Sequence, residues 1–471
     1  MSKSSFNKSN FILVSLAIVS ALFFGLVTLF LTQAFGHRYL YFLGLPAAML
    51  IGLLFIFNRY IFFFLVVLSR SSLDVAFNAI KVGSFGLGAV LNALVILIAL
   101  LTLIEKPVKI TVNLNSIKWA WLVFLGLSCL SLAYAPSFVA SLKIFLIYVS
   151  YAAMFVLGLT LVKSEEDFGK WIKAIILSSI IPVVYGIFSL FLGGKGVRFS
   201  IQEGLRLQST FPHPNTLAPY LVLVITICFY SYKTKNKFIS SGFLKIFPIY
   251  MAILLGLVLM TKTRSAWAAC YLFFGLYALL YERKLLILMI LAPFFALLIP
   301  DVQDRVMDLA RDNDFGANGY GRLNSYAWRK QIWANAITWM SETRYLFGYG
   351  VSSFIHYSTE FGMANAFERQ KFEINAHNVY VQMFFELGLF GVISFIYLIF
   401  AHLRTLASLY SHNKLLIFTV IVLLVEFLFE SYSDNMMDYL IFNWYLWFVV
   451  GLTLSYVSRL VPTSSQVIQK R

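Results

Sequence analysis

The sequence predicts an all-α polytopic membrane protein with about 12–14 transmembrane helices. Hydrophobic residues make up 60% of the 471 residues and charged residues only 12%, whereas soluble domains are about half apolar and a quarter charged. Several apolar runs, such as 11–31 and 87–103, are near the ~20 residues needed to cross a hydrocarbon core. The runs are continuous and do not alternate with polar residues, which favours helices over a barrel.

The expected spans follow one another with a single long interruption. We place them at 11–33, 39–57, 60–69, 86–104, 119–135, 140–162, 171–192, 214–231, 246–261, 265–281, 284–300, 378–401, 415–430 and 439–458. The first run is too long for the core of a signal peptide, so we interpret it as a retained span. The only long hydrophilic stretch divides the chain into two parts of a transmembrane bundle, 1–300 and 377–471, and a large helical loop, 301–376.

Basic residues predict the orientation of the bundle. The net charge is +16, and most lysines and arginines of the short connections fall in every second connection, as in cytoplasmic loops. The excess therefore reports topology, and we expect no nucleic acid as a partner. This pattern places the N-terminus in the cytoplasm and the large loop on the extracytoplasmic face.

An amphipathic helix is predicted within the large loop, over 326–342. Its apolar residues recur at helical spacing and share one face; they are Trp328, Ile332, Trp333, Ala336, Ile337 and Met340. Such a helix would lie on the membrane or cap a cavity. Packing is the commoner role of such an aromatic stripe, and stacking on sugars is the alternative.

Five polar clusters share the outward side, each within a few residues of a span end. They are SRSSLD at 69–74, LRLQSTFPHPN at 205–215, TKTRS at 261–265, HN at 377–378 and SYSDN at 431–435. Their common side is best explained by a shared site. Arginine on this face suggests an anionic ligand, because its planar fork binds phosphate through two bonds; the alternative is contact with lipid headgroups.

The residue types favour transfer of a group from a lipid pyrophosphate. Histidine exchanges a proton near neutral pH, and arginines stabilise the charge on a phosphate leaving group. The sequence has no HExxH motif, no cysteine pair and no GxSxG motif, so we expect neither a metal site nor a serine nucleophile. For His377 the alternative is a capping or hydrogen-bonded histidine at a helix start, and for His213, between two prolines, a structural turn residue is favoured.

Four segments between about 200 and 400 carry a family resemblance. They are Arg206 with STFPHPNTLA, TKTRSAW, GRLNSYAWRKQIW with LFGYG, and AHNVYVQMFFELGLFG. In sequence and order they resemble the O-antigen polymerase and O-antigen ligase superfamily of bacterial envelope glycosyltransferases. The resemblance implies a C-type glycosyltransferase fold in the bacterial cytoplasmic membrane, with the active site on the periplasmic face. It also implies that the enzyme acts on undecaprenyl-pyrophosphate-linked glycans without a metal or other cofactor.

The resemblance also implies roles for individual residues. His377 would be the catalytic base, and Arg206 and Arg264 would bind the pyrophosphate. Arg70 would be a further pyrophosphate-binding residue. Supporting polar groups would be Asn378, Asn215, Asp74 and Asp434. The histidine and proline before Asn215 depart from the Gly-Asn-Pro-Asn of related sequences, which leaves a direct role for His213 open.

The expected reaction is an inverting glycosyl transfer. In a polymerase, which the number of spans and the long loop favour, the acceptor is another lipid-linked repeat unit; in a ligase it is lipid A-core. The expected partners are the lipid-linked glycan and membrane lipid, and a chain-length regulator protein is a further candidate. A flippase would have repeated halves and charges inside the membrane. A metal-dependent transferase would need acidic residues in the first outward loop, and 33–39 has none.

Overall fold

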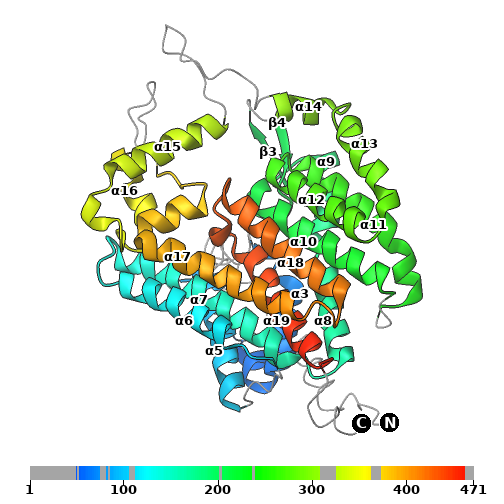
Figure 1. Cartoon of the computed structure of the whole chain (residues 1–471), viewed down its shortest axis with the longest axis horizontal. Coiled ribbons are helices and arrows are strands. Elements are labelled where there is room, and N and C mark those ends of the chain that lie inside the picture. Colours follow the sequence, from blue (N-terminus) through cyan, green and yellow to red (C-terminus); the bar gives the residue numbers. More distant parts are fainter. Residues whose placement is uncertain are drawn as a thin grey trace, which may run out of the picture.

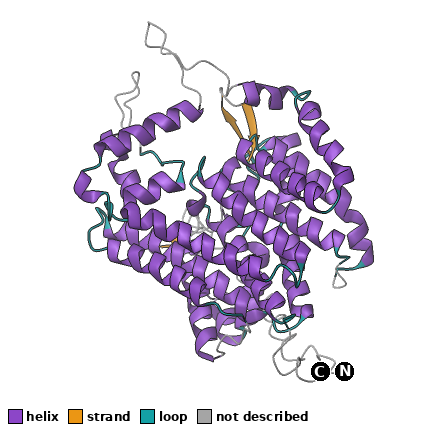
Figure 2. Cartoon of the chain, viewed as in Figure 1, coloured by secondary structure: helices purple, strands orange, loops and turns teal. Residues whose placement is uncertain are grey.

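The computed structural model describes residues 49, 52–74, 81–82, 85–105, 112–200, 204–235, 239–307, 325–361 and 373–461. Most of these residues are helical and very few are in strands, which confirms the predicted all-α class (Figures 1 and 2). They include two small antiparallel sheets, one of β1 (Lys81–Val82) with β2 (Phe85–Gly86) and one of β3 (Val197–Ser200) with β4 (Gly204–Leu207). The expected span 11–33 and most of 39–57 lie outside the described residues.

Most helices belong to one bundle. In chain order they are α3 (Arg59–Ser69), α5 (Leu87–Glu105), α6 (Asn115–Ser131), α7 (Phe138–Leu161), α8 (Glu165–Ser178), α9 (Ile180–Leu192), α10 (Pro214–Lys233), α11 (Ser241–Met260), α12 (Arg264–Leu280), α13 (Leu286–Ala296), α17 (Val379–Ser408), α18 (Lys414–Ser431) and α19 (Leu440–Ser458). The shorter helices are α14 (Pro300–Met307), α15 (Ser325–Trp339), α16 (Ser353–Phe361), η2 (Arg283–Leu285), η4 (Glu342–Arg344) and η5 (Met436–Asp438).

Each expected span from 60–69 onward coincides with a described helix or helix pair, but not all of them are full spans. Seven helical segments are long and apolar enough to cross a membrane, and α13 with α14, bent by 87°, would make eight. Helices α3, α6 and α12 are shorter, and α18 carries three charged residues. The described residues therefore confirm a multi-pass membrane protein with fewer full-length spans than the 12–14 expected.

Helix α19 lies at the centre of the bundle. Nearly all its side chains are buried, so it is apolar on every face, as expected for a helix surrounded by others. It packs closely against α7, where Gly158 and Gly451 face one another. A Cβ on either glycine would collide with the backbone of the other helix, and small residues allow this approach between membrane helices.

Helix α17 is broken at Gly388, which has a φ of +67°. Residues 345–350, which are Tyr345 and the LFGYG segment of the large loop, lie against the break. Backbone hydrogen bonds join the two segments: Leu389 N to Tyr345 O (2.7 Å), Phe390 N to Leu346 O (3.3 Å), Tyr349 N to Phe385 O (3.0 Å) and Gly350 N to Glu386 O (2.7 Å). Side chains at Gly348 or Gly388 would collide with the opposite backbone. Two of the segments that carry the family resemblance are thus complementary surfaces.

Helix α15 packs on α16 and α17 through its apolar face, at one end of the bundle (Figure 1). Ile332, Trp333, Ala336 and Met340 are buried, as the helical periodicity predicted. Ile337 is 41% exposed, so its placement on the packed face was wrong. The helix therefore caps this end of the bundle while part of its surface remains open.

Candidate functional site

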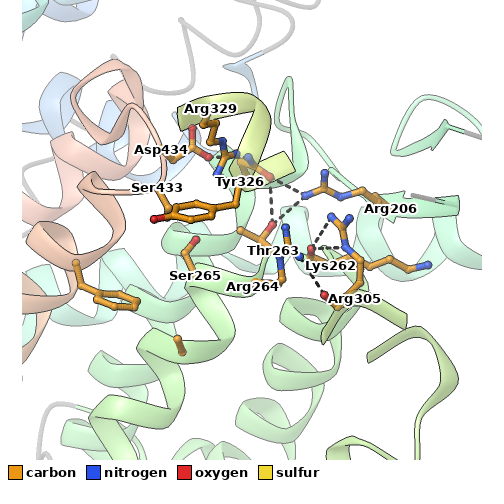
Figure 3. A pocket seen from close by; sticks show the side chains of 13 residues that line it. Arg206, Lys262, Thr263, Arg264, Ser265, Arg305, Tyr326, Arg329, Ser433 and Asp434 are labelled. Carbon is orange, nitrogen blue, oxygen red and sulfur yellow. Dashed lines mark hydrogen bonds between the residues drawn. The ribbon is translucent and has the colours of Figure 1, made fainter. Parts of the chain in front are cut away.

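A pocket of about 340 Å³ opens at the end of the bundle that carries α15 (Figure 3). Five basic side chains line it: Arg206, Lys262, Arg264, Arg305 and Arg329. The other lining residues are Asn215, Thr263, Ser265, Ala268, Tyr326, Phe429, Ser433 and Asp434. Five cations around one carboxylate make this pocket suited to a ligand with several negative charges.

Arg206 extends from β4 and is held in one orientation. Its side chain is buried, and its Nε donates to Thr261 O at 2.8 Å. One terminal nitrogen, Nη2, donates to Asn215 Oδ1 at 2.6 Å and to Thr263 Oγ1 at 3.2 Å. The guanidinium is therefore fixed by the starts of α10 and α12 before any ligand binds.

The start of α12 is tied to α14 of the large loop. Lys262 has a φ of +52°, and its Nζ forms an ion pair of 2.7 Å with Asp301. Arg264 donates to Arg305 O at 3.0 Å, and Arg305 donates to Lys262 O at 3.1 Å. These contacts bring Arg305 to the pocket beside Arg264, which was expected to bind the pyrophosphate.

Arg329 reaches the pocket from α15. Within the described ranges no hydrogen bond or ion pair of its guanidinium is found, and its Nε is buried. A buried guanidinium nitrogen without a partner is costly, so this side chain is poised to bind a ligand. The other pocket cations all have protein partners.

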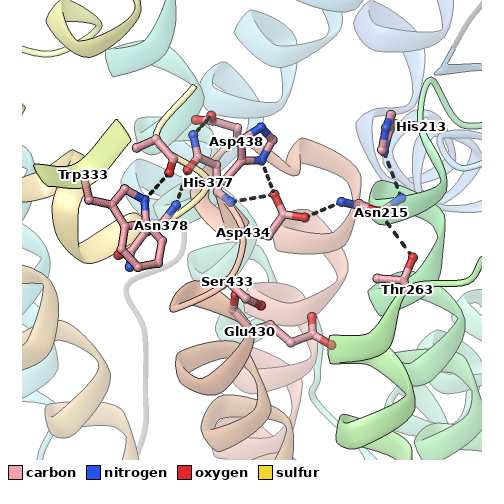
Figure 4. A network of polar contacts seen from close by, with 12 residues as sticks. His213, Asn215, Thr263, Trp333, His377, Asn378, Glu430, Ser433, Asp434 and Asp438 are labelled. Carbon is pink, nitrogen blue, oxygen red and sulfur yellow. Dashed lines mark hydrogen bonds and ion pairs between the residues drawn. The ribbon is translucent and has the colours of Figure 1, made fainter. Parts of the chain in front are cut away.

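A chain of polar contacts joins Arg206 to His377 through Asn215 and Asp434 (Figure 4). Asn215, which accepts from Arg206, donates through Nδ2 to Asp434 Oδ2 at 2.6 Å. Asp434 Oδ1 lies 3.1 Å from His377 Nδ1. Residues from α10, the turn after α18 and the loop before α17 therefore form one network, as the shared side of their clusters suggested.

Asp434 sets the tautomer of His377. Burial alone would raise the pKa of Asp434, but the hydrogen bond and charge of His377, together with the charge of Arg329, hold this pKa well below its usual value. The side chain is then a carboxylate, which only accepts hydrogen bonds, so His377 Nδ1 carries the hydrogen. This leaves the lone pair on Nε2.

The backbone around His377 is rigid. His377 has a φ of +48°, an uncommon value for a residue other than glycine. Asn378 N donates to Asn435 Oδ1 at 2.8 Å, and the Asn378 side chain caps α17 by accepting from Val381 N at 3.0 Å. The cap is therefore Asn378 and not His377, whereas His377 is a hydrogen-bonded histidine at this helix start, with Asp434 as its partner. The His377 side chain is free to face the site and is 32% exposed.

Five predicted site residues are not among those that line the pocket: His377, Asn378, Arg70, Asp74 and His213. Arg70 and Asp74 form an ion pair of 2.7 Å with each other, and the Arg70 side chain is only 2% exposed. The Arg70 guanidinium also lies 5.6 Å from the centre of the Trp444 ring, in the core. His213 is the N-cap of α10 and accepts from Asn215 N at 3.1 Å. Its role as a turn residue, the favoured interpretation, agrees with this position, where it helps to orient Asn215.

Three residues at the site were not predicted from the sequence: Arg305, Arg329 and Asn435. Both arginines lie in or beside the large loop, which is too long for charge distribution to be informative. A signal was nevertheless present for Arg329, because it lies one helical turn before Trp333 in the predicted amphipathic helix. Asn435 was part of the SYSDN cluster but had no assigned role.

A family comparison agrees with this site. Residues 249–396 match the O-antigen ligase family model. This match confirms the predicted resemblance, over about a third of the chain. The matched stretch includes Arg264, Arg329, His377 and Asn378, while Arg206 and Asp434 lie outside it. No curated protein matches the chain significantly. Among the residues that the structure describes, no three His, Cys, Asp or Glu side chains form a group that could hold a metal ion.

Proposed function

We propose that this protein is a polysaccharide polymerase of the bacterial cytoplasmic membrane. It would transfer a glycan from undecaprenyl pyrophosphate to a sugar hydroxyl of another lipid-linked repeat unit, at the periplasmic face. The observation that carries the proposal is the hydrogen-bonded chain from Arg206 through Asn215 and Asp434 to His377. It joins a group that binds a charged leaving group to a base that activates a nucleophile.

His377 acts as the base. Its Nε2 takes the proton of the acceptor hydroxyl while that oxygen attacks the anomeric carbon of the donor sugar. The bond from the anomeric carbon to the phosphate oxygen breaks on the opposite side, so the configuration is inverted. Asp434 holds Nδ1–H and stabilises the imidazolium that forms.

The arginines act on the leaving group. Undecaprenyl pyrophosphate departs with the electron pair of the broken bond and gains negative charge. Arg206, Arg264 and Arg329 line the pocket in which this charge develops, and guanidinium groups neutralise phosphate through paired hydrogen bonds. Arg206 is fixed beforehand, whereas Arg329 would gain its partners only when the substrate binds.

A ligase is the second candidate, because the matching family model is that of O-antigen ligases. It would use the same donor and the same residues, with lipid A-core as the acceptor. The product distinguishes the two reactions. A long glycan on polyprenyl pyrophosphate indicates a polymerase, and a glycan on lipid A-core indicates a ligase.

The test is glycan transfer by the purified protein in nanodiscs that contain lipid-linked repeat units. We expect His377→Ala and Arg329→Ala each to lower the rate by about 10²-fold or more, with full activity in EDTA. Arg329→Ala is the cleaner arginine variant, because it removes no protein hydrogen bond seen in the described residues.

Matched controls are His412→Ala and Arg404→Ala, since both side chains are exposed at or near the C-terminal end of α17, away from the pocket. We expect both variants to have wild-type rates. Near-normal transfer by His377→Ala would refute its assignment as the base. A strict metal requirement would transfer the protein to the metal-dependent class of C-type transferases.

A further inference from the structure

Two tyrosine rings form an open aromatic edge of the pocket. Tyr326, from the first turn of α15, lines the pocket, and its hydroxyl lies 3.1 Å from that of Tyr432 at the end of α18. The two residues are 37% and 49% exposed. By contrast, Trp333 on the same helix is buried. Both tyrosines are therefore partly exposed beside a polar site.

The position of these rings is coupled to His377. The Trp333 ring packs edge-on against both tyrosines, with centroids 5.6 Å from Tyr432 and 6.3 Å from Tyr326. The Trp333 indole N–H donates to Ala376 O at 2.6 Å, directly before His377. A third ring, that of Trp328, lies 5.8 Å from the His377 imidazole. One buried tryptophan thus sets the distance between the open rings and the base.

The two walls of the pocket differ in chemistry. Arg206, Arg264 and Arg305 lie on the side of β4, α12 and α14, whereas Tyr326 lies with Arg329 and Asp434 on the side of α15 and the end of α18 (Figure 3). Aromatic rings with a hydroxyl offer both an apolar face and a hydrogen-bonding edge. A sugar ring matches this combination, because its C–H groups form an apolar face and its hydroxyls lie at its rim.

We propose that Tyr326 and Tyr432, with Trp328, form a subsite that binds a sugar ring of the acceptor glycan. The proposal rests on the proposed function, and it assigns the acceptor to this wall because the rings lie on the His377 side of the pocket. Stacking on the tyrosines brings one hydroxyl of that sugar towards Nε2 of His377. The donor pyrophosphate occupies the cationic wall, so the two substrates meet between the walls.

The experiment compares Tyr432→Leu and Tyr432→Phe with the wild type in nanodiscs. Saturation-transfer NMR measures contact between aromatic protons and the oligosaccharide that mild acid releases from the native lipid-linked repeat unit. Steady-state transfer measures KM for the lipid-linked acceptor. The matched control is Tyr232→Leu, since this tyrosine is 40% exposed at the other end of α10.

We expect Tyr432→Leu to reduce the saturation transfer to the sugar and to raise KM for the acceptor about tenfold. Tyr432→Phe keeps the ring and should stay within about threefold of the wild type. Binding of undecaprenyl pyrophosphate without a sugar should be the same in all variants, because the tyrosines do not contact it. Tyr232→Leu should match the wild type in every measurement.

Unchanged saturation transfer and KM in Tyr432→Leu would overturn the subsite. The subsite would also be overturned if Tyr432→Leu changed only the contacts of the protein with lipid and not those with the sugar. Interfacial tyrosines also form aromatic belts at membrane surfaces. Failure of the proposed function gives a different result, namely that the wild type does not bind undecaprenyl pyrophosphate. The sugar signal then still decides whether the tyrosines bind a glycan.

Discussion

Replacing Asp434 by asparagine tests the link between the two halves of the site. Both carboxylate oxygens are used: Oδ1 contacts His377 Nδ1 and accepts from Asn435 N, while Oδ2 accepts from Asn215 Nδ2. Asparagine has the same shape but replaces one acceptor by a donor. If the new side-chain NH2 faces Asn215, two donors meet. If it faces His377, the Nδ1–H tautomer loses its acceptor.

The size of the effect follows from the geometry. With Nδ1 3.1 Å from the carboxylate oxygen, the charge centres of the imidazolium and the carboxylate are about 4 Å apart. Their attraction is ~4 kcal/mol at an effective dielectric constant of about 20. The His377 side chain is 32% exposed, so solvent screening reduces this attraction to ~3 kcal/mol. Each ~1.4 kcal/mol changes a rate tenfold, so we expect kcat to fall about 10²-fold.

The assay is glycan transfer at saturating donor, with folding checked by thermal unfolding in detergent. Asp438→Asn is the control. This carboxylate lies four residues after Asp434 and accepts a hydrogen bond from Asn435 Nδ2 at 3.1 Å, with no hydrogen bond to His377. The double variant His377→Ala with Asp434→Asn should be no slower than His377→Ala alone, since residues that act as a unit are not additive. A folded Asp434→Asn protein that retains more than about a third of the wild-type kcat would refute the role of the pair.

Two further predictions concern stability. Gly388→Ala should lower the free energy of unfolding by ~3 kcal/mol or more, because the residue has a positive φ and its Cβ would meet the backbone at Leu346; Gly126→Ala, with open space around it, should leave this free energy unchanged or raise it by up to ~1 kcal/mol. Equal thermal unfolding of the two variants would contradict this reasoning. Burial, together with the charge of Asp434, raises the pKa of Asp438 to about 6 from 3.8, so the folded state binds more protons between these values and stability falls as the pH rises through them. Asp438→Asn should therefore stabilise the protein above pH 6, by at most ~3 kcal/mol, and match the wild type below about pH 4; an equal difference at both pH values would exclude this carboxyl as the cause.

The sequence predicted the fold through features that act locally. Apolar length and helical periodicity placed the described helices and α15, because burial of apolar surface decides both. The charge distribution placed the polar clusters on one side before any contact was known. His377, Arg206 and Asn215 then joined one network, since residues at the ends of neighbouring helices have few other places to lie.

What the sequence could not predict depends on contacts between distant segments. Arg70 and Arg206 both stand in outward clusters, yet one is neutralised by Asp74 four residues away and the other lines the pocket. Arg329 gained its place only because α15 packs on α16 and α17 at this end of the bundle. Ile337 is exposed because the packed face of α15 is narrower than its run of apolar residues. Such outcomes follow from packing angles, which periodicity does not contain.

The junction at Gly388 has a consequence for building hybrid enzymes. Because 345–350 supply the backbone partners that the broken helix lacks, the large loop and α17 form one hydrogen-bonded piece. Exchanging the loop with that of a relative while keeping 385–390 would separate two backbone segments that are hydrogen-bonded and closely packed against each other. A workable exchange would cut after α17, so that the loop, the glycine break and His377 travel together.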